Sequence, residues 1–177
     1  MKMINLYVMA VSLLVVIAGC KSYPLPEGAV AVKPFDVDRY MGTWYEIARF
    51  DLRFERNLNN TTATYSLNED GSVKVTNRGF NYVKGQWKET VGKAKFVGDS
   101  KEARLKVSFF GPFYGGYNVI ALDPDYTYAL IAGSSLDYLW ILARTKTIPE
   151  ELKQEYIRIA REIGFNTDEL IWVEHDK

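Results

Sequence analysis

The sequence predicts an all-β domain of eight antiparallel strands in simple succession, followed by one C-terminal helix. Between Thr43 and Arg144, short runs alternate apolar with polar residues and are separated by turn residues, a pattern typical of an antiparallel barrel or sandwich. No spacer between these runs is long enough for a parallel crossover. The last four runs are apolar on both faces, so a further element must cover their outer side.

The strands can be placed in order along the chain. The first begins at Gly42, and the second covers residues 61–67. Asp70–Gly71 is a strong two-residue hairpin signal, and Val73 and Val75 continue the apolar face after it. The remaining strands are expected around residues 94–96, 104–109, 117–122, 128–132 and 138–143, with a Gly- and Pro-containing loop at 110–116.

The element that covers the sheet is predicted to be a helix. Thr147 and Glu150 have the spacing of a capping box, Pro149 lies in the expected first turn and Gly164 stands just past the end. Apolar residues recur at helical spacing and form one stripe, which we expect to pack on the sheet. A last short strand at 170–173 is expected to return to the sheet. The stripe consists of Leu152, Tyr156, Ile159, Ala160 and Ile163.

The N-terminus is predicted to be a signal peptide over residues 1–19 and a lipidated tether over 20–34, ahead of one domain at 35–177. After Lys2 comes an apolar run too short to span a membrane. The small residues Ala18 and Gly19 before Cys20 resemble the bacterial lipoprotein box, in which the cysteine is diacylated. Lys21, where Asp would signal retention, resembles export to the outer membrane, with the domain facing the periplasm. An ordinary signal peptide with a stray cysteine is the alternative.

Composition argues against several classes of function. The 22 basic and 22 acidic residues balance, and no basic block is present to follow nucleic acid. The one histidine, His175, is two residues from the C-terminus. No nucleophile triad, metal-ligand cluster or phosphate loop occurs, so we expect neither an enzyme nor a metal or cofactor. A pair of Glu46 with a tyrosine acting on a bound lipid is the catalytic alternative.

Three motifs, in order, carry a resemblance to a known family. Gly42-x-Trp44 opens the first strand, 122–126 (Leu-Asp-Pro-Asp-Tyr) separates two later strands, and Arg144 ends the eighth. This sequence resembles the lipocalin family, and together with the lipoprotein box it looks like the bacterial outer-membrane lipocalins. The resemblance implies an up-and-down barrel of eight strands that holds one ligand. It also implies a closed end at which Arg144 lies over the Trp44 ring, with Gly42 beside them. The middle motif has one extra residue and Leu for Thr, which weakens any receptor role at that end.

Alternation along the strands predicts which side chains face the cavity. If Trp44 points inward, Glu46 and Ala48 do as well, and a buried Glu46 must be paired or protonated. The open rim then carries the loops that follow the odd-numbered strands. In the strands that are apolar on both faces, Arg144 as the reference places Tyr138 and Trp140 inside. The family resemblance implies that Tyr117, Val119 and Ile131 also face in. The predicted ligand contacts are Ala48, Tyr65, Phe96, Val107, Phe109, Tyr117, Val119, Ile131, Tyr138 and Trp140, and the predicted rim residues are Leu52, Arg53, Phe54, Phe110, Phe113 and Tyr114.

Such a cavity is long, apolar and aromatic, and it suits an acyl chain. We expect a fatty acid or a lysophospholipid as the ligand, and a membrane as a partner through acylated Cys20. Exposed aromatics beside cations at the rim also fit contact with a membrane surface. A tetrapyrrole carrier and a structural envelope protein with a filled barrel are the alternatives, and the sequence leaves open whether the chain forms a homodimer.

Overall fold

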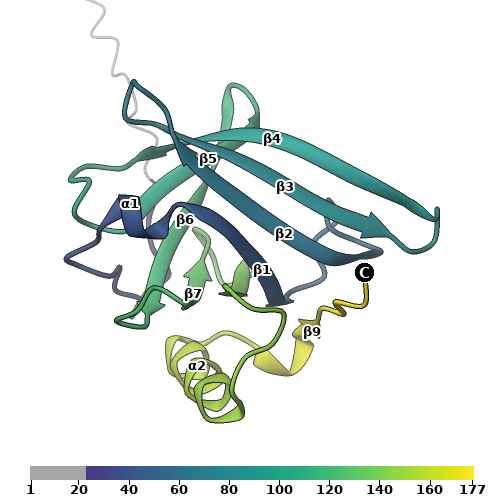
Figure 1. Cartoon of the computed structure of the whole chain (residues 1–177). Coiled ribbons are helices and arrows are strands. Elements are labelled where there is room, and N and C mark those ends of the chain that lie inside the picture. Colours follow the sequence, from purple (N-terminus) through teal and green to yellow (C-terminus); the bar gives the residue numbers. More distant parts are fainter. Residues whose placement is uncertain (1–22) are drawn as a thin grey trace, which may run out of the picture.

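The computed structural model describes residues 23–177, so the predicted signal peptide and Cys20 lie outside the described residues. Each strand pairs antiparallel with the next, and β1 pairs with both β2 and β8, which closes an up-and-down barrel (Figure 1). This confirms the expected fold class and decides between barrel and sandwich. The barrel strands are β1 (Gly42–Arg49), β2 (Leu58–Leu67), β3 (Val73–Asn81), β4 (Gln86–Phe96), β5 (Arg104–Phe110), β6 (Phe113–Leu122), β7 (Tyr128–Ala132) and β8 (Leu139–Ala143).

The remaining elements lie around the barrel. The one-turn helix α1 (Val37–Tyr40) precedes β1, and the helix α2 (Glu150–Ile163) follows β8. The 3-10 turn η1 (Thr167–Glu169) leads into β9 (Ile171–Trp172), which pairs with the end of β1. The sequence predicted α2 and β9 but described α1 only as a polar turn, although Asp36 accepts two backbone N–H bonds as its N-cap.

Among the described residues, no helix combines the length and the apolar character needed to cross a membrane.

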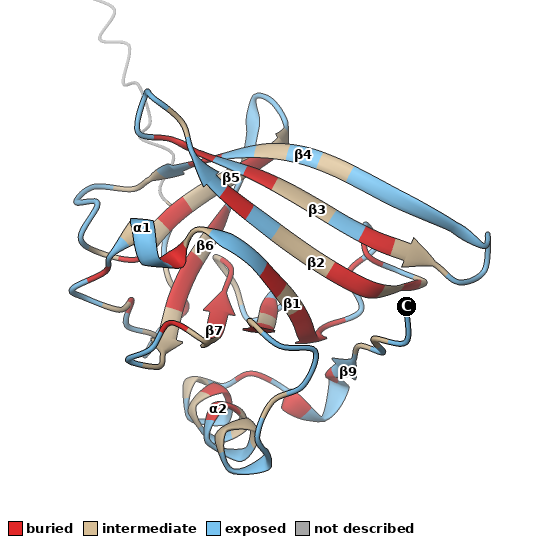
Figure 2. Cartoon of the chain, in the orientation of Figure 1, coloured by how far each residue is buried: buried red, intermediate tan, exposed pale blue. Residues whose placement is uncertain are grey.

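Two apolar clusters lie on opposite sides of the barrel wall. One fills the closed part of the interior and includes Trp44, Val119 and Ile131. The other lies outside, where α2 covers β7 and β8 through Tyr156 and Ala160. Figure 2 shows β7 buried, whereas most of β4 is exposed along its length. β8 is buried at four of its five residues. Of the four runs expected to be apolar on both faces, β7 and β8 are the ones that α2 covers, and β1 joins them in this cluster through Ile47 and Ala48.

The start of α2 differs from the prediction. Pro149 occupies the N-cap position and no side chain caps the helix, so the capping box of Thr147 and Glu150 is not formed. The Thr147 carbonyl instead accepts a bond from Thr145 Oγ1 at 2.8 Å. Glu150 and Glu151 in the first turn interact favourably with the helix dipole. At the other end Gly164 adopts φ 108° and caps the helix as predicted.

Two strands are longer than the sequence suggested. β4 begins at Gln86 rather than near Ala94, and β6 begins at Phe113 rather than Tyr117. In the β4 extension the positions that face the cavity are polar, as at Lys88 and Thr90, and the β6 extension contains Gly115 and Gly116. Neither extension therefore has the apolar inner face by which strands are recognised. The predicted loop at 110–116 is consequently reduced to Gly111 and Pro112 between paired Phe110 and Phe113.

The segment expected to be an extended tether is packed against the barrel from Tyr23 onward. Val32 donates its N–H to the Val119 carbonyl at 2.9 Å and accepts from Ala103 at 3.0 Å. Pro26 and Ala31 are buried. Apolar runs are short in this stretch, and backbone hydrogen bonds hold it instead, so hydropathy gave no sign of its docking.

Candidate functional site

The closed end of the barrel is sealed by one stacked pair. Trp44 is fully buried, and the guanidinium carbon of Arg144 lies 3.9 Å from the centre of its ring. Arg144 also donates to the backbone carbonyls of Thr43 at 3.0 Å and Met41 at 2.8 Å. Gly42 has φ +94°, and a Cβ there would lie 3.3 Å from Arg144 Nη1. The predicted contact of Arg144 over Trp44 is therefore present, and glycine is needed beside it.

The altered middle motif also helps to close this end. Tyr126 accepts a hydrogen bond from the Asp36 N–H at 2.9 Å, and Arg39 lies over its ring at 4.2 Å. Asp123 accepts from the N–H groups of Thr127 at 2.7 Å and Tyr128 at 2.5 Å. The inserted proline is accommodated in this turn, so the fold is unaffected by the extra residue.

Above Trp44, three tyrosine hydroxyls form a chain across the barrel. Tyr117 Oη lies 2.8 Å from Tyr40 Oη and 2.8 Å from Tyr65 Oη. Burial raises the pKa of all three phenols well above their usual value, so they stay neutral at physiological pH. The chain therefore places uncharged polar groups in an otherwise apolar interior.

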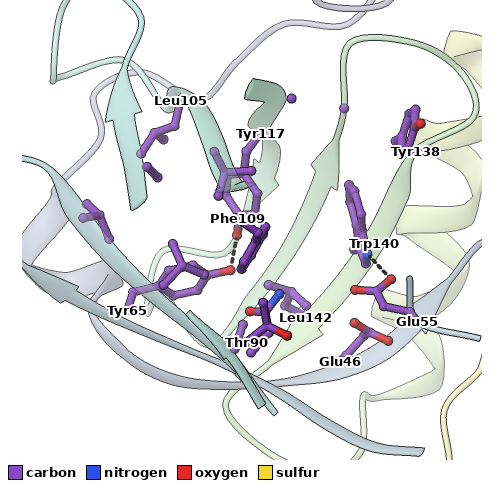
Figure 3. Close-up of a pocket in the computed structure, with 18 of the residues that line it drawn as sticks. Glu46, Glu55, Tyr65, Thr90, Leu105, Phe109, Tyr117, Tyr138, Trp140 and Leu142 are labelled. Carbon is purple, nitrogen blue, oxygen red and sulfur yellow. Dashed lines mark hydrogen bonds between the residues drawn. The ribbon is translucent and has the colours of Figure 1, made fainter. Parts of the chain in front are cut away.

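The barrel encloses a cavity of about 890 Å³ that opens at the end opposite Trp44. This volume is at the upper end of the roughly 300–1,000 Å³ found for small-molecule sites. Strands β5, β6 and β8 supply an apolar and aromatic wall, with Phe109 and Trp140 pointing inward (Figure 3). Six of the ten predicted contacts line the cavity: Tyr65, Val107, Phe109, Tyr117, Tyr138 and Trp140.

The other four predicted contacts do not line the cavity. Phe96 points inward but packs 6.4 Å from the Phe35 ring at the closed end. Val119 and Ile131 are fully buried in the interior cluster, where neighbouring side chains cover them. The prediction that Ala48 faces inward is wrong, because Ala48 packs in the outer cluster beneath α2.

A β-bulge explains the position of Ala48. Glu46 pairs with Leu142 but Ala48 pairs with Ile141, so Ile47 is an extra residue in β1. The extra residue reverses the alternation beyond it. Ala48 therefore turns outward, and Arg49, opposite Trp140, turns into the barrel.

Arg49 completes a buried ionic cluster with two carboxyl groups, which we call the Glu46–Arg49–Glu55 cluster. Glu46 Oε1 accepts from Arg49 Nη1 at 3.2 Å and from Thr61 Oγ1 at 3.1 Å. Arg49 Nε lies 3.9 Å from Glu55 Oε2, and Arg49 Nη2 donates to the Glu55 carbonyl at 3.0 Å. Trp140 Nε1 donates to Glu55 Oε2 at 3.2 Å (Figure 3).

One guanidinium cannot neutralise two buried carboxylates. Burial raises the pKa of Glu46 well above its usual value, the charge of Glu55 adds to this, and Arg49 opposes it. Burial also raises the pKa of Glu55, against the hydrogen bond from Trp140. The cluster therefore favours holding a proton. Both carboxyl groups line the cavity, so a polar group and its proton face the ligand space.

The predicted rim residues divide between exposed and buried. Phe54, Phe110 and Phe113 are 52%, 76% and 73% exposed and line the mouth of the cavity. Arg53 is exposed beside Phe54, and Tyr114 is half-buried in the mouth lining. The remaining rim residue, Leu52, is buried in the outer cluster, because the loop after β1 folds back over that face. Its assignment to the rim is wrong.

Comparison with known proteins identifies the family. The pattern of the Lipocalin-like domain matches residues 35–175. The chain is a lipocalin. It is 55% identical over 166 residues to outer membrane lipoprotein Blc of Citrobacter freundii, covering 94% of each chain. It is 53% identical over 174 residues to outer membrane lipoprotein Blc of Escherichia coli K12, covering 98% of each.

The fold of this lipocalin also matches solved structures. Insecticyanin from the tobacco hornworm Manduca sexta superimposes with a TM-score of 0.68 at 20% identity, over 86% of this chain and 87% of that one. At that identity the likeness concerns the fold alone. The Blc relatives, which are much closer, support an outer-membrane, lipid-anchored location and a lipocalin role in binding a hydrophobic ligand.

Sequence reasoning missed two members of the ionic cluster in this lipocalin, Arg49 and Glu55. A sign of the bulge was present, because uninterrupted alternation would have placed Arg49 outward, on a face that needs apolar residues under the helix. Glu55 gave no comparable sign, since it reaches Trp140 from a loop whose path depends on tertiary packing.

Proposed function

We propose that this lipocalin binds and carries a single-chain lipid, a fatty acid or a lysophospholipid, in the bacterial envelope. The observation that carries the proposal is the cavity of about 890 Å³, which is open at one end and lined mostly by apolar and aromatic side chains. Polar groups gather on one side of it, at Glu46, Glu55 and Thr61. A lipid would place its acyl chain among the aromatic residues and its polar end toward the mouth.

The energetics favour lipids with one chain. Burying 16 methylenes out of water is worth roughly 12 kcal/mol, from which association removes several kcal/mol. A lipid in a bilayer already buries its chain, so the apolar contribution nearly cancels when the protein takes lipid from a membrane. The protein then favours lipids that leave membranes readily, and these are the single-chain species.

We also infer that Cys20 is diacylated and anchors the protein, and that the protein binds rather than transforms its ligand. Two or three acyl chains suffice for stable anchoring, whereas one binds only marginally. Cys20 is the only cysteine of the chain and stands at the expected cleavage point. Lys21 beside it fits export to the outer membrane.

The binding proposal is tested with the delipidated soluble domain and a fluorescent fatty acid, together with native mass spectrometry. We expect a displaceable signal, and one lysophospholipid or fatty acid retained per chain. Val107→Trp, which fills the cavity from β5, should weaken binding about tenfold or more. Val91→Trp is the matched control, because Val91 is 51% exposed on the outside of β4.

The outcomes separate this proposal from its alternatives. No uptake of either lipid class would indicate a filled structural barrel and overturn the proposal. A visible absorption band in protein purified from its own membrane would instead support a chromophore carrier.

A further inference from the structure

The N-terminal segment before α1 is fixed to the closed end of the barrel. Besides the bonds of Val32 to Val119 and Ala103, Phe35 donates its N–H to the Lys101 carbonyl at 2.8 Å. These bonds join the segment to the starting end of β5 and the last half of β6. The chain between Val32 and Phe35 is therefore part of the folded domain rather than a linker.

From this end the segment runs back toward the mouth of the cavity. A turn closed by the Ala29 N–H and the Pro26 carbonyl at 3.0 Å, with Gly28 at φ +82°, redirects the chain. Tyr23 then contacts Tyr114 edge-to-face, with ring centres 6.5 Å apart. Tyr114 is the second residue of β6, next to the β5–β6 turn at the rim.

A cation strengthens this docking of Tyr23. Lys106 Nζ lies 4.9 Å from the Tyr23 ring centre and 5.2 Å from that of Tyr114, within the range of cation–π attraction. Tyr23 itself lines the mouth of the cavity. The first described residue of the chain is thus held at the open end of the barrel.

The short distance in sequence from Tyr23 to Cys20 limits where a lipid anchor can lie. Only Lys21 and Ser22 lie between the two positions, and the three extended steps from Tyr23 to Cys20 reach at most about 11 Å. A strand of ten residues such as β6 spans about 33 Å. Acyl chains on Cys20 can therefore reach a bilayer beside the mouth, whereas the closed end lies well beyond their reach.

The rim surface has the chemistry of a membrane interface. Phe54, Phe110 and Phe113 are each more than half exposed around one opening, although an isolated soluble domain gains nothing from leaving them in water. Arg53 and Lys84 are exposed on the rim loops, and neither forms an ion pair within residues 23–177. Exposed aromatic rings and exposed cations on loops of the same end suit the headgroup region of an anionic bilayer.

We propose that the docked N-terminal segment holds the mouth of this lipocalin against the membrane that anchors it. The rim aromatics then lie at the lipid interface, and the ligand passes between bilayer and cavity without crossing open solvent. This inference rests on the acylation of Cys20 proposed above. It differs from the expectation of an extended tether, which would leave the orientation of the domain free.

The orientation can be measured on the full acylated chain in vesicles of phosphatidylethanolamine and phosphatidylglycerol. Because Cys20 is the only cysteine, acylation leaves an introduced cysteine as the only free thiol. Phe110→Cys places an environment-sensitive fluorophore at the rim, and Glu69→Cys places one in the exposed β2–β3 turn at the closed end. We expect nitroxide lipids to quench the fluorescence of the label at Phe110→Cys about three times as strongly as that of the label at Glu69→Cys, or more. The proposal is overturned if the two labels are quenched equally, or if the emission of the rim label shows that it lies in water.

The role of the docked segment is tested by lengthening the chain. A Gly/Ser spacer of about 20 residues between Ser22 and Tyr23 adds about 25 Å of mean reach, so the ratio of quenching should fall toward one. An unchanged ratio would mean that the segment does not set the orientation. Lys84→Cys, at the β3–β4 turn, provides a second rim label if Phe110→Cys fails to fold.

Separate measurements distinguish a failure of Cys20 acylation from a failure of the proposed orientation. The mass of the N-terminal peptide reports whether Cys20 is acylated before any label is read. An unacylated Cys20 removes the anchor proposal and this inference with it. Lipid binding by the soluble domain is measured separately, so its failure would leave the orientation result standing.

Discussion

At the closed end of the barrel the aromatic rings are buried, whereas rings of the same kind at the open end stand in solvent. Phe35, Tyr40 and Trp44 are 5%, 3% and 0% exposed, but Phe110 and Phe113 are 76% and 73% exposed. At the closed end the polar atom of the buried indole is also satisfied, because Trp44 Nε1 donates to the Tyr40 carbonyl at 2.9 Å. The rings at the closed end therefore contribute to the stability of the fold, whereas those at the open end contribute little to it.

The largest difference between the ends is expected when one phenylalanine is removed from each. Phe35→Ala should lower the free energy of unfolding by about 3 kcal/mol, since it opens a cavity among packed rings. Phe113→Ala should change it by less than about 0.5 kcal/mol, since it removes an exposed ring. Urea unfolding of the soluble domain measures both. Equal losses would contradict the division between the ends.

The second prediction concerns the cation at the closed end. Arg144→Met should lower the free energy of unfolding by about 2 kcal/mol, because several backbone carbonyls, including the partly buried one of Met41, lose their donor. Arg144→Lys should recover only part of this, since one ammonium cannot reach several carbonyls at once. Thermal unfolding of the three proteins, followed by circular dichroism, provides the measurement. Full recovery by lysine would show that charge alone matters.

A third prediction uses pH to examine the middle of the barrel. The folded pKa of Glu46 is raised by burial above its unfolded value of about 4.3, so the folded protein binds this proton more tightly. The contribution to stability is then fully present below the unfolded pKa and is lost as pH rises through the folded pKa. Urea unfolding measured between roughly pH 5 and pH 8 should show the free energy of unfolding fall as the pH rises.

Glu46→Gln should flatten that decline, because a neutral amide still accepts from Arg49 and Thr61 and leaves Arg49 paired with Glu55. Glu89→Gln, at an exposed position of β4, is the matched control and should leave the pH dependence unchanged. A pH dependence that persists in Glu46→Gln would assign the titration to another group.

The smallest effect on stability is expected at the rim. The double substitution Phe110→Ser and Phe113→Ser should leave the free energy of unfolding within about 1 kcal/mol. It should slow the transfer of a fluorescent lipid from vesicles about fivefold, since the rim loses its interfacial rings. Trp87→Ser, which removes an exposed ring on the outside of β4, is the control and should leave the rate of transfer unchanged.

Much of the fold could be predicted because its signals are local. Alternating runs, the Asp70–Gly71 turn and the apolar stripe of α2 each depend on residues close in sequence. The cavity wall followed from the same alternation wherever a strand is regular, as at Tyr65 and Val107. At the bulge, the extra residue Ile47 reverses the alternation of inward and outward side chains, so the inward position of Arg49 could not be predicted. Leu52, Glu55 and the docked segment at Tyr23 depend on contacts distant in sequence, which no local pattern records.

The chain of tyrosine hydroxyls across the barrel leaves one hydrogen-bond donor unused. Tyr40, Tyr65 and Tyr117 carry one O–H each, but the two bonds between them use only two of these three protons. Whichever hydroxyls donate, one of the three O–H groups is left over, and all three residues border the ligand space. A lipid tail bearing a hydroxyl or keto oxygen partway along its length would meet a ready donor deep inside the protein, where a plain alkyl chain would leave that donor unused.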